Sequence, residues 1–269
     1  MGRYAVIGYP ISHTLSPLIH NANFEAKGTA DHYSAIAVHP DQLTHIREII
    51  RSNGLDGFNV TIPHKEKIMA HLDHVDRDAM KIGAVNTVAV DGDVLTGYNT
   101  DVTGYLDAFN QTFGKQHRRI LIIGAGGAAK AVHRAHANNG DSVTIAARRM
   151  ERFQFFKTAD FKAVLISDIP GLDPHDVIIN TTPVGMKHED LLKEMEIPES
   201  LITENTLGVD LIYQPEKTKF LEYFAENNYM NGMPMLIHQA MDAYTLWTGE
   251  QGDIAAVNRK YKAHIGGKS

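Results

Sequence analysis

The segment "RILIIGAGGAAKAVHRAHANNG", residues 119–140, constrains the fold more than any other part of the sequence. An apolar run leads directly into Gly124, Gly126 and Gly127, and an alanine-rich, helix-like stretch follows. In this pattern the first glycine permits a tight turn, the second lets the backbone approach a pyrophosphate, and the first-turn N–H groups of the helix face the anion. A glycine-rich turn without a ligand is the alternative. The strand before the turn and the helix after it favour dinucleotide binding.

The next strand-like run, "DSVTIAARR", indicates which dinucleotide is bound. Units that bind NAD carry Asp or Glu near its end, to hold the ribose 2′-hydroxyl. Here the run ends in Ala146, Ala147, Arg148 and Arg149. Guanidinium groups bind phosphate and no carboxylate opposes one, so NADP(H) is favoured over NAD(H). The alternative is that both arginines are solvated loop residues.

Short β-rich runs alternate with helix-like segments along most of the chain, which is typical of parallel βαβ units. We expect an α/β protein of two domains, the first with a mainly parallel sheet and the second of Rossmann type. The first comprises residues 1–101 plus 237–269, where the last segment is helical and packs back. The second comprises residues 102–236. Two alternating runs flank Asp91-Gly92-Asp93 and predict a hairpin.

Helix boundaries in the first domain are predicted from capping residues and glycines. Ser16 is expected to be the N-cap of a helix that runs to Gly28. A second helix is expected over 40–54, and a third over 65–72.

Composition excludes several classes of function. The chain has 26 Lys and Arg against 32 Asp and Glu, with no basic block, so nucleic-acid and membrane partners are not expected. It has no cysteine and no apolar run near the roughly 18 residues of a membrane span. We therefore expect a cytoplasmic protein that binds small solutes. Its 15 histidines include no H-E-x-x-H pattern, so no metal site is expected.

"GFNVTIPHK", residues 57–65, places polar side chains at the end of an apolar strand. Asn59 and Thr61 are expected on one face of that strand, and Lys65 in the turn that follows. The carboxyl ends of strands are where open α/β sheets bind ligands, so the three residues are candidates for a polar ligand site. Taken alone, Lys65 is better interpreted as a solvated first-turn lysine.

Other polar residues fall at comparable turns and suit a polyhydroxylated substrate. Each also has a structural interpretation: Ser16 and Asp101 as helix caps, Asn86 and Asn99 as turn residues.

Eight motifs in order resemble the shikimate dehydrogenase family over nearly the whole chain. They are "GYPISHTLSPLIHN", "FNVTIPHK", "GAVNTV", "GYNTDVTG", "GAGGAAKA", "NTTPVGM", "DLIYQPEKTKFL" and "NGMPMLIHQA". The resemblance implies metal-free, reversible reduction of 3-dehydroshikimate to shikimate by NADPH, on the route to aromatic amino acids. It also implies a substrate domain followed by an NADP domain, in a monomer or homodimer.

The resemblance assigns roles residue by residue. Lys65 and Asp101 would be the catalytic pair. Substrate contacts would come from Thr14, Ser16, Asn59, Thr61, Asn86, Tyr213 and Gln239. Cofactor contacts would come from Gly124, Ala125, Gly126, Gly127, Ala128, Arg148, Arg149, Thr181, Thr182, Met186 and Gly232. His13 and His64 lie within the motifs, and either line the cleft or are turn residues bonded to backbone.

The chain departs from the family pattern at two places. Thr14 replaces a serine, and Ala147-Arg148-Arg149 replaces Asn-Arg-Thr, which bears on the strength of the NADP preference. Two alternative functions stay open. One is a dehydrogenase of the same family that uses quinate, and the other is a ligand sensor without catalysis.

Overall fold

The structure is a computed structural model that describes residues 1–12, 14–156 and 160–266. The chain forms two compact units. The first unit comprises Met1–Gly104 together with the segment from Leu236 onward, and the second comprises Tyr105–Met235. The boundaries expected from the sequence, after residues 101 and 236, lie less than one helical turn from these positions.

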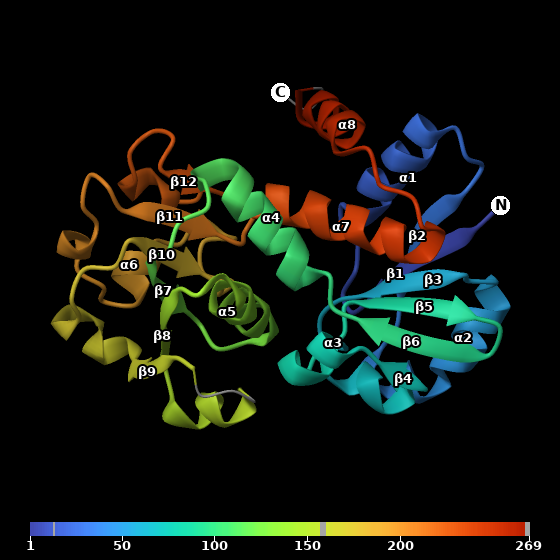
Figure 1. The fold of residues 1–269 in the computed structure, drawn as a ribbon, viewed down its shortest axis with the longest axis horizontal. Helices are drawn as coiled ribbons and strands as arrows, with labels where there is room; N and C mark the ends of the chain where they lie inside the picture. The colour runs from blue at the N-terminus through green and yellow to red at the C-terminus, as the bar shows by residue number, and fades with distance from the viewer. Residues whose placement is uncertain (13, 157–159, 267–269) are drawn as a thin grey trace. The chain divides into compact units, whose positions relative to one another are not determined.

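A six-stranded mixed sheet forms the centre of the first unit, in the order β2-β1-β3-β5-β6-β4 (Figure 1). Its strands are β1 (Arg3–Gly8), β2 (His32–Ala37), β3 (Gly57–Val60), β4 (His74–Val75), β5 (Thr87–Asp91) and β6 (Val94–Tyr98). Strand β1 is parallel to β2 and β3, β5 is antiparallel to β3 and β6, and β4 is parallel to β6. The predicted hairpin is confirmed by the β5–β6 pairing.

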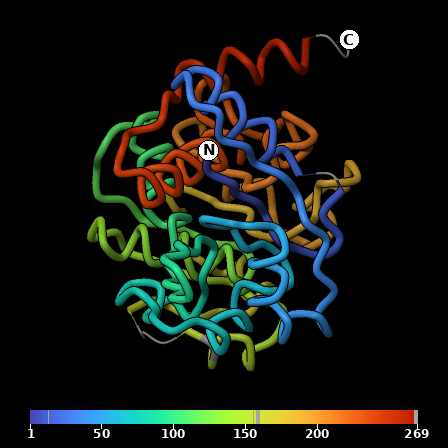
Figure 2. The backbone as a smooth tube through the Cα atoms, turned by 90° about the vertical axis from the view of Figure 1, so that its right-hand side faces the viewer, coloured from blue at the N-terminus to red at the C-terminus, as the bar shows by residue number. Residues whose placement is uncertain are grey.

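The helices of the first unit are α1 (Ser16–Lys27), α2 (Ile46–Asn53), α3 (Arg77–Ile82) and α8 (Ile254–Gly266). The boundaries between the units fall within α4 (Asp101–Phe113) and α7 (Met233–Thr248). Helix α8 packs against α1, so the C-terminal segment returns to the first unit as expected (Figures 1 and 2). Helices α1 and α2 end at Gly28 and Gly54, both in the left-handed conformation that glycine adopts readily.

One predicted helix feature is wrong, and two predicted helices form with a 3₁₀ part that the sequence did not indicate. Leu15, not Ser16, is the N-cap of α1, because the Ser16 hydroxyl bonds to Thr14 instead of a helix amide. The helix expected over 40–54 begins as a 3₁₀ helix, Pro40–His45, before α2. The helix expected over 65–72 is a single 3₁₀ segment, Lys67–His71, because the chain turns back into β4 directly afterwards.

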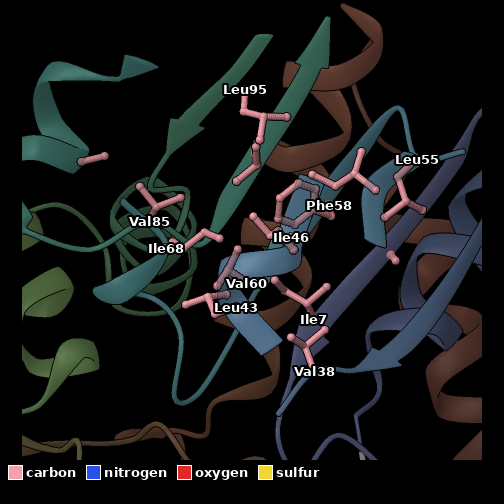
Figure 3. Close-up of a cluster of buried hydrophobic side chains, with 14 residues drawn as sticks. Ile7, Val38, Leu43, Ile46, Leu55, Phe58, Val60, Ile68, Val85 and Leu95 are labelled. Carbon is pink, nitrogen blue, oxygen red and sulfur yellow. The ribbon is translucent and has the colours of Figure 1, made fainter. Parts of the chain in front are cut away.

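Strand β1 is buried on both faces, and its alternate residues enter two different apolar clusters. Ala5 and Ile7 pack with Phe58 and the other side chains of the cluster in Figure 3. Tyr4 and Val6 pack with an aromatic cluster on the other face, completed by Phe24, Tyr33, Tyr244 and Trp247. The sheet is therefore covered on both sides along its parallel half, and polar side chains inside it require partners.

The second unit contains a parallel six-stranded sheet in the order β12-β11-β10-β7-β8-β9. Its strands are β7 (Arg119–Ile123), β8 (Ser142–Ala147), β9 (Lys162–Leu165), β10 (Val177–Asn180), β11 (Leu207–Asp210) and β12 (Tyr229–Met230). Its helices include α5 (Gly127–Asn139) and α6 (Leu191–Glu194). The strand order reverses direction at β7, and such a switch point is where open parallel sheets bind ligands. The expected α/β class with a Rossmann-type second sheet is confirmed.

Candidate active site

Lys65 and Asp101 form an ion pair in the first unit, although they are far apart in the sequence. Lys65 follows β3, and Asp101 is the first residue of α4. Lys65 Nζ donates to Asp101 Oδ2 at 2.6 Å, with 24% of the lysine and 9% of the aspartate side chain exposed. Such a half-buried pair holds an ammonium group at a fixed position while leaving it accessible to a small molecule.

Asn86, immediately before β5, holds the second oxygen of that carboxylate. Its Nδ2 donates to Asp101 Oδ1 at 2.8 Å, and its Oδ1 accepts from the backbone N–H of Thr100 at 2.7 Å. An N–H can only donate and a carboxylate can only accept, so these partners fix the orientation of the amide. Both oxygens of Asp101 are thereby held, one by Lys65 and one by Asn86.

Gln239, on α7, lies at the edge of the same cluster. Its Oε1 is 3.4 Å from Asn86 Nδ2, and its Nε2 donates to the backbone carbonyl of Leu236 at 2.7 Å. The C-terminal segment of the first unit therefore contributes a side chain to the site.

Asn59, on β3, is buried, and its hydrogen bonds within the protein use most of its capacity. Its Nδ2 donates to Asn86 O at 3.2 Å and to Thr87 Oγ1 at 3.0 Å, and its Oδ1 accepts from Tyr33 at 2.6 Å. With both amide hydrogens engaged, Asn59 can meet a ligand only as an acceptor, through Oδ1. Any substrate hydroxyl that meets Asn59 must therefore donate to it.

The other predicted substrate residues of the first unit lie in the segments that follow β1 and β3. Thr14 and Ser16 follow β1, and Thr14 Oγ1 donates to Ser16 Oγ at 3.1 Å. Thr61 is half-buried beyond the end of β3, which stops at Val60. Tyr213 belongs to the second unit, where burial raises the pKa of its hydroxyl.

Two candidates with open roles are bonded to backbone. Asn99 accepts from the N–H of Asp101 and donates to the carbonyl of Ala84, as a turn residue does. The His64 ring is buried with Nε2 at 2.7 Å from Val38 O, while His13 lies outside the described residues.

A cavity of about 350 Å³ in the second unit opens at the glycine turn between β7 and α5. The turn contributes Gly124, Ala125 and Gly126, β8 and its end contribute Ala147, Arg148 and Arg149, and the loop after β10 contributes Thr181, Thr182 and Pro183. Arg152, Ile166 and Met195 complete the lining. Gly127 and Ala128 begin α5 beside it.

The glycine turn fits a pyrophosphate on two observations. Gly124 has φ of 114°, and a Cβ there would lie 2.5 Å from Thr181 Oγ1, so only glycine is accommodated. A Cβ on Gly126 would meet nothing within 4 Å, which leaves the space for a ligand. No side chain caps the start of α5, so its first-turn amides face that space.

Three arginines give the cavity a positive side. Arg148 and Arg149 were predicted from the sequence, and Arg152 adds a third. Arg152 is held near the glycine turn, since its Nη2 donates to the carbonyl of Ala125 at 3.4 Å. Among the described residues that line the cavity, none is acidic. The side chains present suit a phosphate on the ribose better than a free hydroxyl.

The loop after β10 is shaped by Asn180 and Asp210. Asn180 Oδ1 accepts from the N–H and hydroxyl of Thr182, and its Nδ2 donates to Val184 O and to Asp210 Oδ1 at 3.1 Å. Asp210 is fully buried, and burial raises its pKa to about 6. Besides Gly127 and Ala128, two more predicted cofactor residues lie outside the cavity lining: Met186, which is 58% exposed, and Gly232, which donates its N–H to Ile212 O.

Over the described ranges, no group of three or more histidine and acidic side chains is placed to hold a metal ion. In the same part of the chain, the structure contains no helix with the length and apolar character needed to cross a bilayer.

Comparison with known proteins assigns the chain to a family. Residues 6–88 match the model of the shikimate dehydrogenase substrate binding domain, and residues 232–260 match the shikimate 5'-dehydrogenase C-terminal domain. A shikimate dehydrogenase (NADP(+)) of Staphylococcus epidermidis is 40% identical over 259 residues, covering 95% of each chain. The chain belongs to the shikimate dehydrogenase family.

Solved structures of the shikimate dehydrogenase family share the fold. The Thermus thermophilus enzyme, in complex with NADP(H) and shikimate, has a TM-score of 0.85 and 32% identity, covering 98% of this chain and 99% of that one. A quinate dehydrogenase from Corynebacterium glutamicum, in complex with NAD, has a TM-score of 0.87 and 26% identity, covering 97% and 99%.

Sequence reasoning missed several polar residues of this shikimate dehydrogenase family member. Arg152 could have been found as the third arginine of "ARRMER", one 3₁₀ turn beyond Arg149. Thr87 directly follows Asn86 in a quoted motif but reads as an ordinary strand residue. Nothing in the local sequence of Tyr33 marks its hydroxyl as a partner of Asn59.

Proposed function

We propose that the protein catalyses the reversible, NADPH-dependent reduction of 3-dehydroshikimate to shikimate, in the synthesis of aromatic amino acids, with Lys65 and Asp101 as the catalytic pair. The observation that carries the proposal is the accessible Lys65 ammonium, held 2.6 Å from the Asp101 carboxylate among the polar side chains of the first unit. Membership of the shikimate dehydrogenase family, and the arginine-lined cavity at the glycine turn, support the same conclusion.

The cofactor is held by the second unit. The backbone at Gly124–Gly126 and the first turn of α5 bind the pyrophosphate, and Arg148, Arg149 and Arg152 bind the ribose 2′-phosphate. NADPH, when bound, supplies the hydride that reduces the ketone.

Lys65 supplies the proton. Reduction of the ketone leaves an alkoxide, and the Lys65 ammonium neutralises it by proton transfer. Asp101 keeps the ammonium in place through the 2.6 Å hydrogen bond, and Asn86 keeps Asp101 in place. In the oxidation of shikimate the same lysine, in its neutral form, accepts the hydroxyl proton.

The substrate is held by hydroxyl and amide side chains of the first unit. The side chains that can offer further hydrogen bonds to the substrate are those of Thr14, Ser16, Thr61 and Gln239. Asn59 accepts one hydrogen bond from it through Oδ1. Tyr213 is a further substrate residue from the second unit, and Thr181, Thr182, Met186 and Gly232 are neighbours of the cofactor.

Replacing the lysine tests the catalytic role. Lys65→Ala is expected to lower kcat for shikimate oxidation by roughly a thousandfold while KM for shikimate changes little, because proton transfer is lost and most substrate contacts remain. Lys67→Ala, two residues on and fully outside the ion pair, is the matched control and should keep full activity. A rise in KM with unchanged kcat would make Lys65 a binding residue instead.

A four-way assay tests the substrate and cofactor together. Rates with shikimate and quinate, each with NADP+ and NAD+, are expected to be highest for shikimate with NADP+. The similarity to a quinate dehydrogenase makes NAD-linked quinate oxidation the second candidate, and a faster rate for that pair would establish it. Failure of every pair at high enzyme concentration would instead favour a ligand sensor.

A further inference from the structure

A continuous chain of hydrogen bonds runs from the aromatic cluster of the first unit to the ion pair. Tyr33 donates to Asn59 Oδ1 at 2.6 Å, Asn59 Nδ2 donates to Thr87 Oγ1 at 3.0 Å, and Thr87 donates to Asn86 Oδ1 at 3.0 Å. Asn86 Nδ2 then donates to Asp101 Oδ1 at 2.8 Å. All five residues are buried, and Thr87 is 0% exposed.

Two backbone groups, one that can only accept and one that can only donate, fix the donor-to-acceptor direction of this series of hydrogen bonds. The backbone carbonyl of Asn86 accepts from Asn59 Nδ2, and the backbone N–H of Thr100 donates to Asn86 Oδ1. Neither amide can rotate by 180° without placing donor against donor or acceptor against acceptor. Thr87 lies between the two amides: its Oγ1 accepts from Asn59 Nδ2 and donates to Asn86 Oδ1, and Thr100 Oγ1 lies 3.1 Å away as a further partner. A hydroxyl can make these bonds and a methyl group cannot.

The Tyr33 end of this series of hydrogen bonds is held in place by ring packing. The His20 ring stacks on the Tyr33 ring, with centroids 4.0 Å apart and planes at 7°. Burial lowers the pKa of His20 to about 3 and raises the pKa of Tyr33, so His20 stays neutral and Tyr33 keeps its hydrogen. The Tyr33 hydroxyl is therefore a constant donor to Asn59.

We propose that Thr87 is a positioning residue for the catalytic pair: its hydroxyl joins Asn59 to Asn86 and so sets the carboxylate of Asp101 against Lys65. Thr87 is fully buried and acts only through its neighbours. The proposal rests on the proposed catalytic role of Lys65 and Asp101.

Removing the hydroxyl at constant shape tests the proposal. Thr87→Val is expected to lower kcat for shikimate oxidation roughly tenfold, the effect of one lost hydrogen bond, and to leave KM for NADP+ unchanged. Thr87→Ser, which restores a hydroxyl, is expected to recover most of the rate. Thr206→Val is the matched control. Thr206, in the second unit, is also buried, and its hydroxyl bonds to the backbone N–H and the hydroxyl of Thr203.

A double-mutant cycle separates positioning from a general loss of stability. If Thr87 acts through Asp101, the tenfold effect of Thr87→Val should shrink to less than about twofold in an Asp101→Asn background. The same fold loss in both backgrounds, or the same loss in Thr206→Val, would overturn the proposal. Unchanged kcat in folded Thr87→Val would overturn it as well.

Tyr33→Phe keeps the test decisive where Thr87→Val does not fold. It removes one donor at the end of the chain and keeps the ring that stacks on His20. If Tyr33→Phe lowers kcat and this loss disappears in the Asp101→Asn background, the proposed positioning of Asp101 is supported. A loss that is the same in both backgrounds, or no loss at all, overturns the proposal. A different result would show that Lys65 and Asp101 are not the catalytic pair: Asp101→Asn or Lys65→Ala alone would then retain activity.

Discussion

Asp210, at the end of β11, is a carboxyl whose chemistry is changed by burial. It accepts hydrogen bonds from Asn180, Ile212 and Thr218, yet burial outweighs them and raises its pKa to about 6. In the unfolded chain an aspartate titrates near pH 4, at about 3.9. The folded protein therefore retains this proton at pH values where the unfolded chain has lost it.

The pH dependence of stability follows from the sign of that shift. The pKa of Asp210 is higher in the folded protein than in the unfolded chain. The contribution of its proton to stability is therefore complete below about pH 3.9 and is lost as the pH rises through about 6. Relative to Asp210→Asn, which does not titrate, the free energy of unfolding of the unmodified protein should fall by about 3 kcal/mol across that window. Urea unfolding followed by circular dichroism measures it, and a difference that stays constant with pH would contradict the shift.

Local sequence predicts single site residues unevenly. Lys65 by itself reads as a surface lysine, and only the resemblance across eight motifs singles it out together with Asp101. The capping role predicted for Ser16 is wrong, because the helix begins at Ser16 itself with Leu15 as its N-cap, and the Ser16 hydroxyl accepts from Thr14. The Tyr33–Asn59 and Thr87–Asn86 contacts depend on how β2, β3 and β5 lie in the sheet, which no local pattern specifies.

At the scale of the elements, the turn between β7 and α5 needs two glycines for different reasons. Gly124 has a positive φ and no room for a Cβ beside Thr181, whereas Gly126 faces open space within the cavity lining. Gly124→Ala is expected to destabilise the fold by roughly 1–3 kcal/mol. Gly126→Ala should leave the melting temperature nearly unchanged and weaken NADP+ binding.

The two variants serve as controls for each other. Thermal unfolding without ligand measures the first effect, and fluorescence titration with NADP+ measures the second. Equal melting temperatures for both variants would show that the turn tolerates a side chain at position 124, against the geometry described above.

The sequence predicts the strands of this molecule better than it predicts whether a helix is an α-helix or a 3₁₀ helix. The run at 3–8 became β1 as expected, and the hairpin around Gly92 formed at the predicted place. Sequence periodicity does not separate an α-helix from a short 3₁₀ segment such as Lys67–His71, because five residues are too few to show a period.

For the whole molecule, the alternation of strands and helices predicts two α/β units, and the structure contains two sheets with separate apolar cores. The order of strands within each sheet is not contained in that alternation. It follows from which edges each new strand can pair with, and in the second unit it places the reversal at β7, beside the glycine turn.

The assignment of the cofactor site to the second unit and the substrate site to the first predicts where each ligand protects backbone amides from hydrogen exchange. All the residues that line the arginine-rich cavity belong to the second unit, and Lys65, Asp101 and Asn86 belong to the first. In hydrogen exchange followed by mass spectrometry, NADP+ alone should slow exchange in peptides covering 124–128, 147–152 and 181–183. Shikimate alone should slow exchange around 59–65, 86 and 99–101, since bound ligands suppress local opening where they bind. Slowing in the second unit by shikimate alone, with none in the first, would contradict the assignment of the substrate site to the first unit.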